Sequence, residues 1–304
     1  MRVVFMGTPS FAVPSLRALA KEHDVELVVT RPDAVRGRGR RLQPSPVKAA
    51  AQELGLSVLE TRRIGNEEIE HISGVQPQII CVAAYGAILP DELLEIPTLG
   101  TVNVHASLLP RGRGAAPIQR AVLEGDEFAG VSIMRIVHDL DAGPYCSQAS
   151  LAIENKPCVQ VMDELANLGA SELIDALEQI EQGTAVWTEQ DAALATYAAK
   201  VEKHEMLLDP KDPAMVNLRR VKASLDAAPA RAMVAGRGLR VLDARVYAKD
   251  VDKGAVYVRK GEVVLGCGEG ALELLRIKPD GKREMDASSW ASGLRGVNIT
   301  WERA

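Results

Sequence analysis

The chain has 304 residues, of which 47% are hydrophobic and 25% are charged, and its formal net charge is -5 at pH 7. This composition is typical of a globular protein with a full core, and the length predicts two domains of about 150 residues each. The acidic balance excludes a global positive field that would attract nucleic acid, so any such partner needs a local basic patch.

The N-terminus and the cysteines indicate the compartment. The N-terminal apolar run is too short for a signal peptide, and no apolar stretch is long enough to span a membrane. Cys81, Cys146, Cys158 and Cys267 form no CxxC pair, and no histidine lies at a zinc-like spacing. We therefore expect a cytoplasmic protein with reduced thiols, no metal and no membrane partner.

The first part of the chain alternates strand-like and helix-like segments. Strands are predicted at residues 1–6, 25–30, 57–59, 79–84, 102–105 and 130–137. Helices are predicted at residues 12–21, 46–54, 67–72, 117–123 and 159–182, with Gly183 as the stop signal of the last. The alternation predicts an α/β fold, in which a Rossmann-like, mostly parallel sheet has helices on both faces. This domain is expected to cover residues 1–187.

The character of the sequence changes after Trp187. Residues 188–205 are rich in alanine and charge and lack a clear apolar stripe, which is typical of a linker. Residues 206–304 form the expected second domain, with a helix at 212–224 and strands at 239–242, 255–258, 262–265 and 272–277. Short strands separated by glycines and an Asp-Gly turn predict a small β-barrel.

The first predicted strand ends at Gly7-Thr8-Pro9. A dinucleotide fingerprint needs G-x-G-x-x-G at this point, and this chain supplies one glycine before Pro9 and Phe11. The segment is better explained as a turn at the carboxyl edge of a parallel sheet, where ligands bind.

The segment from Asn103 to Gly114 is the strongest candidate for a site. Residues two apart in a strand share a face, so Asn103 and His105 project together while Val102 and Val104 face the core. A lone histidine at a strand end is about as often a satisfied structural residue as a functional one. The neighbouring amide and the Pro- and Gly-rich loop that follows favour function.

A second candidate follows the predicted strand that ends at Val137. His138, Asp139 and Asp141 precede Gly143-Pro144, and such residues just beyond a strand are typical of an active-site loop. An aspartate before a glycine is also a common turn residue, and the pattern alone favours neither reading.

The loop of residues 31–48 is strongly basic. Its charged residues are Arg31, Arg36, Arg38, Arg40, Arg41 and Lys48, with the single acid Asp33. Glycines alternate with arginines, so we expect the loop to be disordered when unbound. A charge run is usually a solvated surface loop, but cations concentrated beside a predicted cleft of an acidic protein suit phosphate binding.

Together these motifs resemble the methionyl-tRNA formyltransferase family, and the similarity extends over the whole chain. The stretch N-x-H-x-S-L-L-P with a downstream aspartate is typical of folate-dependent formyltransferases, and the basic loop and the second domain narrow the resemblance to the tRNA-acting family. The matching segments are Gly7-Thr8-Pro9, Phe11-Ala12-Val13-Pro14, Pro44-Ser45-Pro46-Val47-Lys48, Ala84-Tyr85-Gly86, Leu89-Pro90, residues 103–110, Gly114-Ala115-Ala116-Pro117-Ile118-Gln119, residues 139–144 and Ala195-Thr196-Tyr197-Ala198.

The resemblance implies a Rossmann-like catalytic domain, an OB-like C-terminal barrel that faces tRNA, and 10-formyltetrahydrofolate as the formyl donor. The family's catalytic trio falls on Asn103, His105 and Asp141. Its folate-contacting loop falls on Ser107, Leu108, Leu109 and Pro110. Its acceptor-stem-contacting loop falls on residues 34–44, with Arg36, Arg38, Arg40 and Arg41. The implied partners are charged initiator tRNA and folate, and we expect a monomer.

Several positions depart from the family pattern. Gly112 stands where the family usually has Trp, Ser10 where it has an acid, and Gln78 where it has Asp. A Trp-containing motif is missing near residues 208–210, and an aromatic residue is missing near residues 227–229. These departures concern substrate fit and the tRNA-facing domain and leave the catalytic trio intact.

The implied chemistry is attack of the methionyl amine on the formyl carbon. A donor such as Asn103, aimed at the developing oxyanion, is worth about 3–4 kcal/mol. Proton transfer by His105 would contribute about 100- to 10,000-fold, with Asp141 orienting the imidazole.

Three alternatives remain open. A formyltransferase acting on a sugar nucleotide or glycinamide ribonucleotide would share the trio, but would not need the arginine loop or the barrel. A hydrolase would release formate from the same carrier. A third alternative is a non-catalytic RNA-binding module, and the intact trio argues against it.

Overall fold

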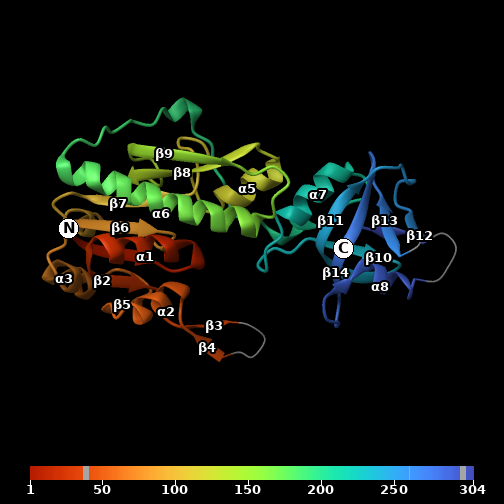
Figure 1. The fold of residues 1–304 in the computed structure, drawn as a ribbon, viewed down its shortest axis with the longest axis horizontal. Coiled ribbons are helices and arrows are strands. Elements are labelled where there is room, and N and C mark those ends of the chain that lie inside the picture. Colours follow the sequence, from red (N-terminus) through yellow and green to blue (C-terminus); the bar gives the residue numbers. More distant parts are fainter. Residues whose placement is uncertain (37–40, 260, 295–298) are drawn as a thin grey trace. The chain divides into compact units, whose positions relative to one another are not determined.

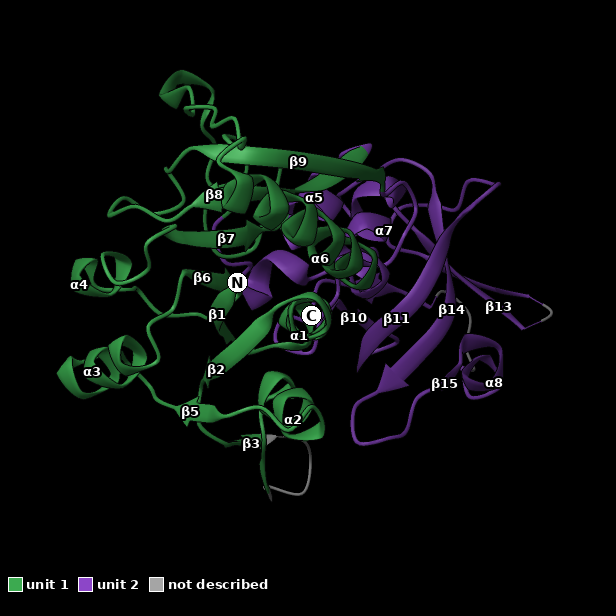
Figure 2. Ribbon diagram, turned by 60° about the vertical axis from the view of Figure 1, so that its left-hand side comes forward, with its two compact units in different colours: residues 1–117, 128–152, 162–198 green, residues 118–127, 153–161, 199–304 purple. Residues whose placement is uncertain are grey.

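The computed structural model describes residues 1–36, 41–259, 261–294 and 299–304. The chain forms two compact units (Figure 2). Unit 1 comprises residues 1–117, 128–152 and 162–198, and unit 2 comprises residues 118–127, 153–161 and 199–304. The domain boundaries expected at residues 187 and 205 remain a prediction.

Unit 1 is built on a sheet with the strand order β5-β2-β1-β6-β7-β8-β9 (Figure 1). The neighbours from β5 to β7 pair in parallel, whereas β8 pairs antiparallel with β7 and with β9. The strands are β1 (Arg2–Gly7), β2 (Asp24–Thr30), β5 (Val58–Glu60), β6 (Ile79–Ala83), β7 (Thr101–His105), β8 (Phe128–Arg135) and β9 (Tyr145–Ala152). The prediction of a Rossmann-like, mostly parallel sheet is confirmed.

Helices cover both faces of this sheet because its central strands are apolar on both faces. On one face, Ile72 of α3 (Asn66–Gly74) packs with Met6 and Val82. On the other face, α6 (Cys158–Gln182) lies so close to β7 that a side chain at Gly169 would collide with Val104. The other helices of the chain's first half are α1 (Val13–Glu22), α2 (Pro46–Glu53), α4 (Asp91–Leu94) and α5 (Pro117–Glu124).

Two parts of unit 1 differ from the expectation. The segment expected to be an irregular loop contains β3 (Ala34–Arg36) and β4 (Arg41–Gln43), which pair antiparallel. Strand β9 was not predicted, because its sequence mixes serine and glutamine with small apolar residues. It lies at the edge of the sheet, where alternate side chains remain exposed, so a strong apolar pattern is not required there.

Unit 2 contains an antiparallel sheet with the strand order β12-β13-β14-β11-β10-β16, in which β15 also pairs with β14. A bridge between Ala255 and Thr300 links the two ends of this order, so the sheet forms a nearly closed barrel, as expected for an OB-like domain. The elements are α7 (Ala214–Lys222), β10 (Arg231–Val234), β11 (Arg237–Tyr247), β12 (Val256–Arg259), β13 (Glu262–Gly266), β14 (Ala271–Pro279), β15 (Met285–Asp286), α8 (Ala287–Ala291) and β16 (Trp301–Glu302).

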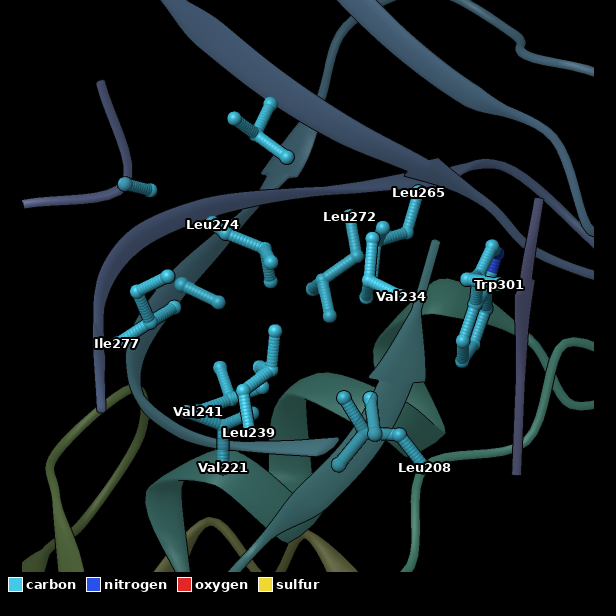
Figure 3. Close-up of a cluster of buried hydrophobic side chains, with 14 of the residues drawn as sticks. Leu208, Val221, Val234, Leu239, Val241, Leu265, Leu272, Leu274, Ile277 and Trp301 are labelled. Atoms are coloured by element: carbon cyan, nitrogen blue, oxygen red, sulfur yellow. The ribbon is translucent and has the colours of Figure 1, made fainter. Parts of the chain in front are cut away.

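The barrel encloses a mostly aliphatic core (Figure 3). Leu208, in the segment 208–210 near which the resemblance leads us to expect a Trp-containing motif, is fully buried in this cluster. The indole nitrogen of Trp301 donates a hydrogen bond to the carbonyl oxygen of Gly266 at 2.8 Å. Strand β16 therefore both closes the barrel and supplies a large side chain to its core.

The cysteines are free, as expected. Burial raises the pKa of the Cys158 thiol to about 12 and that of the Cys267 thiol to about 11. Burial also raises the pKa of Cys81. Thiols held in the neutral form are poor nucleophiles, so these side chains act as small core residues.

Candidate active site

His105 ends strand β7 at the carboxyl edge of the sheet and is 6% exposed. Its Nε2 lies 3.0 Å from the carbonyl oxygen of Gly112, and its Nδ1 lies 3.7 Å from Oδ1 of Asp141. A carbonyl oxygen only accepts hydrogen bonds, so Nε2 carries a hydrogen. In the neutral ring, Nδ1 is then the nitrogen that can gain a proton, and it faces a carboxylate.

Asp141 lies in the loop that follows β8. Its Oδ2 accepts a hydrogen bond from the backbone amide of Gly114 at 2.8 Å, which leaves Oδ1 toward His105. Its φ of 51° is in the left-handed region, which aspartate tolerates better than most residues do. The structure therefore brings together His105 and Asp141, which are 36 positions apart in the sequence.

The other charged residues of this loop are directed elsewhere. His138 is exposed, and its Nδ1 lies 3.2 Å from a carboxylate oxygen of Asp91. Asp139 is exposed as well. Of the two acids between β8 and β9 that the sequence offered, Asp141 is the one that contacts His105.

Asn103 is half-buried on β7, two residues before His105. Its strand neighbours are Val82 on β6 and Met134 on β8. Within the described part of the chain, the side-chain amide of Asn103 has no hydrogen-bond partner. An amide on the same strand face as the imidazole is thus available to a bound molecule.

The segment Ser107–Pro110 is anchored beside this strand by Ser132, which is fully buried and opposite His105 in the β7–β8 pairing. The Ser132 hydroxyl accepts from the Leu109 amide at 3.1 Å and donates to the Ser107 carbonyl at 2.6 Å. Gln148 of β9 donates to the Leu109 carbonyl at 2.9 Å and to the Ser132 hydroxyl at 2.8 Å. The Leu109–Pro110 peptide bond is cis.

The chain after α6 contacts the loop that follows β7. Backbone hydrogen bonds join Arg113 to Thr196 and to Ala198, at 2.9 Å and 2.7 Å. The Thr196 hydroxyl accepts from the Gly112 amide, and Gln190 bonds to the Arg113 side chain. Sequence reasoning missed Gln190 as a site residue, and it used Thr196 only as part of the family resemblance.

Two of the arginines expected to contact tRNA, Arg36 and Arg41, belong to the β3–β4 hairpin. Arg36 and Arg41 are opposite each other in its pairing, and Arg38 and Arg40 lie outside the described residues. The hairpin follows β2, which is three strand spacings from β7 in the parallel part of the sheet. The hairpin and the segment after β7 therefore leave the same edge of the sheet, from strands about 14 Å apart.

Two other cations of the basic segment serve the fold. The Lys48 ammonium lies 2.7 Å from carboxylate oxygens of both Asp33 and Glu60, and these partners raise its pKa. Arg31 donates to the backbone carbonyls of Arg62 and Gly86, both at 2.6 Å. Neither side chain is a free cation for a ligand.

Among the described residues, no group of three or more His, Cys, Asp or Glu side chains is arranged to hold a metal ion. In the same part of the chain, no helix combines the length and the apolar character that crossing a membrane requires.

Comparisons with known proteins show which family the chain belongs to. Residues 1–177 match the family model described as formyl transferase, and residues 200–295 match the model described as formyl transferase, C-terminal domain. The chain is 44% identical to the methionyl-tRNA formyltransferase of Methylococcus capsulatus, over 98% of this chain and 99% of that protein. It is 43% identical to that of Halorhodospira halophila, over 97% of each chain.

Among solved structures, the fold is similar to HypX from Aquifex aeolicus in complex with tetrahydrofolic acid, with a TM-score of 0.66 and 16% identity. That match covers 99% of this chain and 50% of HypX, so the chain spans about half the length of that protein. Because the identity is low, this similarity supports the fold alone. From its two domain matches and its full-length relatives, the chain belongs to the methionyl-tRNA formyltransferase family and is an enzyme of the formyl transferase class.

Proposed function

We propose that the enzyme transfers the formyl group of 10-formyltetrahydrofolate to the α-amino group of methionyl-initiator tRNA, as a monomer in the cytoplasm. The observation that carries the proposal is the approach of Asp141 to Nδ1 of His105, on the strand that also carries Asn103, whose side-chain amide has no partner among the described residues. The full-length relatives named methionyl-tRNA formyltransferase support this acceptor.

The proposed reaction is an acyl transfer between two nitrogens. The neutral methionyl amine attacks the formyl carbon, and the formyl oxygen becomes an oxyanion in the tetrahedral intermediate. Asn103 donates a hydrogen bond to this oxyanion, which is the kind of interaction that stabilises a transition state by about 3–4 kcal/mol.

His105 moves the proton. Its Nδ1 takes a proton from the attacking amine, and Asp141 stabilises the imidazolium by its charge. His105 then delivers the proton to nitrogen 10 of the folate as the bond from that nitrogen to the formyl carbon breaks. The products are formylmethionyl-tRNA and tetrahydrofolate, so atoms and charge balance without a further reactant.

The donor is proposed to contact Ser107, Leu108, Leu109 and Pro110. This segment is bonded to β8, because the hydroxyl of Ser132 on that strand bonds to the Leu109 amide and the Ser107 carbonyl. A loop tied to the sheet at several points can present its backbone to a ligand without a large ordering cost.

The tRNA acceptor stem is proposed to contact residues 34–44 through Arg36, Arg38, Arg40 and Arg41. The hairpin also exposes the cross-strand pair Val35 and Leu42, which are 59% and 69% accessible. An exposed apolar pair next to Arg36 and Arg41 suits a nucleic acid end, where cations neutralise phosphates and apolar side chains contact bases. A small-molecule acceptor would need neither feature.

The acceptor is tested by supplying 10-formyltetrahydrofolate with one acceptor at a time: methionyl-initiator tRNA, a methionyl elongator tRNA, an amino sugar nucleotide or glycinamide ribonucleotide. We expect product with the initiator tRNA and far less with the other three. Efficient use of a small acceptor would replace the proposed substrate. Formate release without any acceptor would indicate a hydrolase, and RNA binding without turnover would indicate a non-catalytic module.

A further inference from the structure

The segment Gln190–Ala198, which the sequence presents as the start of an interdomain linker, contacts the groups on both sides of the His105 ring. We propose that two residues of this segment, Gln190 and Thr196, are positioning residues for the catalytic imidazole. This inference rests on the proposed role of His105 in formyl transfer.

On the Nδ1 side of the ring, the contact runs through Gln190. Its Nε2 donates to the backbone carbonyls of Asp141 at 2.9 Å and of Gly143 at 2.6 Å. Its Oε1 accepts from Nε of Arg113 at 2.9 Å. Two carbonyls require a donor and the guanidinium requires an acceptor, so only an amide satisfies all three partners at this position.

The Asp141 loop needs such a restraint. Asp141 has a φ of 51°, and Gly143 is so close to the backbone of Arg135 that any side chain there would collide. The direction of the Asp141 carboxylate depends on this backbone conformation, because the residue has only two side-chain torsions between the main chain and its oxygens. Holding the carbonyls of Asp141 and Gly143 therefore fixes the distance of the carboxylate from Nδ1 of His105.

On the Nε2 side, the contact runs through Thr196. Its hydroxyl accepts from the Gly112 amide at 2.9 Å, and the Gly112 carbonyl is the group that His105 Nε2 contacts at 3.0 Å. Gly112 has a φ of 73°, in the left-handed region, and because glycine has no Cβ its two peptide groups are held in place mainly by the bonds they make. Thr196 thus determines where the hydrogen-bond acceptor of Nε2 lies.

The backbone holds the segment in place independently of these two side chains. The Arg113 amide donates to the Thr196 carbonyl at 2.9 Å, the Ala198 amide donates to the Arg113 carbonyl at 2.7 Å, and the Ala116 amide donates to the Ala198 carbonyl at 3.1 Å. Removing one side-chain hydrogen bond should therefore leave the segment in place, while the Asp141 carboxylate or the Gly112 carbonyl shifts relative to the His105 ring. Catalytic groups displaced by about 1 Å lose on the order of 100-fold in rate.

The experiment uses near-isosteric variants of the full chain. Gln190→Glu keeps the acceptor for Arg113 and removes the donor to the two carbonyls, and Thr196→Val removes the hydroxyl. Thr196→Ser is the conservative variant that restores the hydroxyl. Leu194→Ala is the matched control, because Leu194 lies in the same segment and is 62% exposed. For each protein, kcat and both KM values are measured with formylfolate and methionyl-initiator tRNA, and the urea unfolding midpoint is recorded.

We expect kcat to fall by about 10- to 100-fold in Gln190→Glu and Thr196→Val, with both KM values within about threefold of wild type. Thr196→Ser should recover most of the rate, and Leu194→Ala should match wild type. Unchanged kcat in both isosteric variants, or a rise in KM alone, would overturn the inference while leaving the proposed function intact. If Gln190→Glu fails to fold, Gln190→Met replaces it, which removes both the donor to the two carbonyls and the acceptor for Arg113. Absence of turnover in the wild type would instead refute the proposed function.

Discussion

The hydrogen bond between Nε2 of His105 and the carbonyl oxygen of Gly112 determines which nitrogen of the ring can act as a base. Because the carbonyl accepts, Nε2 carries the hydrogen, and Nδ1 is left 3.7 Å from the Asp141 carboxylate. The Gly112 carbonyl and the Asp141 carboxylate thus give the two nitrogens of the His105 ring different roles. The predictions for the active site follow from this arrangement.

Replacing Asp141 by Asn should lower kcat by about 100-fold, because the variant keeps an acceptor for the Gly114 amide but loses the charge that stabilises the imidazolium. Steady-state kinetics on purified variants measure this effect. When His105 is already alanine, adding Asp141→Asn should cause little further loss, since the two residues act as one unit. Multiplicative losses in the double variant would show that they act separately.

Ser132→Ala should raise the KM for 10-formyltetrahydrofolate by about tenfold, because it leaves the Leu109 amide and the Ser107 carbonyl without their shared partner. The methionyl-tRNA KM should change much less. Ser150→Ala is the control, since Ser150 is exposed on β9. Equal effects on both substrates would mean that Ser132 supports the domain as a whole rather than the donor loop.

Arg41→Ala should weaken tRNA binding and reduce the slope of log affinity against log salt by about 0.7–0.9, the value for one lost phosphate contact. Binding isotherms at several salt concentrations give this slope. Lys21→Ala provides a surface cation as a control, because Lys21 belongs to α1 and is 81% exposed. A slope that stays the same in Arg41→Ala would count against the hairpin as the tRNA contact.

The stability of unit 2 should depend on Glu205. Its carboxylate lies 2.7 and 3.0 Å from two nitrogens of Arg120 and also accepts from the Glu202 amide, and these bonds lower its pKa from 4.5 to about 2. A lowered pKa in the folded state means that the stabilisation is complete above pH 4.5. It is then lost as the pH falls toward 2.

Glu205→Gln should therefore lower the free energy of unfolding by about 1–3 kcal/mol at pH 7, and the difference from wild type should shrink between pH 4.5 and pH 2. Urea titrations across this range measure it. Glu284→Gln, which breaks the exposed pair with Arg276, should cost less than about 1 kcal/mol. A Glu205→Gln deficit that is the same at pH 3 and pH 7 would exclude the ion pair as its cause.

The central sheet was predictable because its strands are apolar on both faces. Strands such as β1 and β6 are continuous hydrophobic runs, and the alternation with helices follows from burying both faces. Strand β9 and the short pair β3 and β4 were missed, since an edge strand or a three-residue strand leaves little hydrophobic pattern. In unit 2, β10 and β16 were missed for the same reason, as both are short.

The site was predictable to a lesser degree. The shared face of Asn103 and His105 follows from strand periodicity alone. The approach of Asp141 does not, because it depends on a loop that turns back toward β7 with a positive φ. The contacts of Gln190 and Thr196 depend on where the chain passes after α6, and no local pattern in residues 188–198 encodes that path.

The measurement that tests the account most directly is a single-turnover reaction of wild type and His105→Ala with 10-formyltetrahydrofolate and methionyl-initiator tRNA. Formylmethionine is quantified after hydrolysis of the tRNA ester, and binding of each substrate is measured in parallel. We predict that the wild type forms formylmethionine and that His105→Ala does so at least about 100-fold more slowly with nearly unchanged affinities. A His105→Ala enzyme that formylates at a near-normal rate would contradict the account.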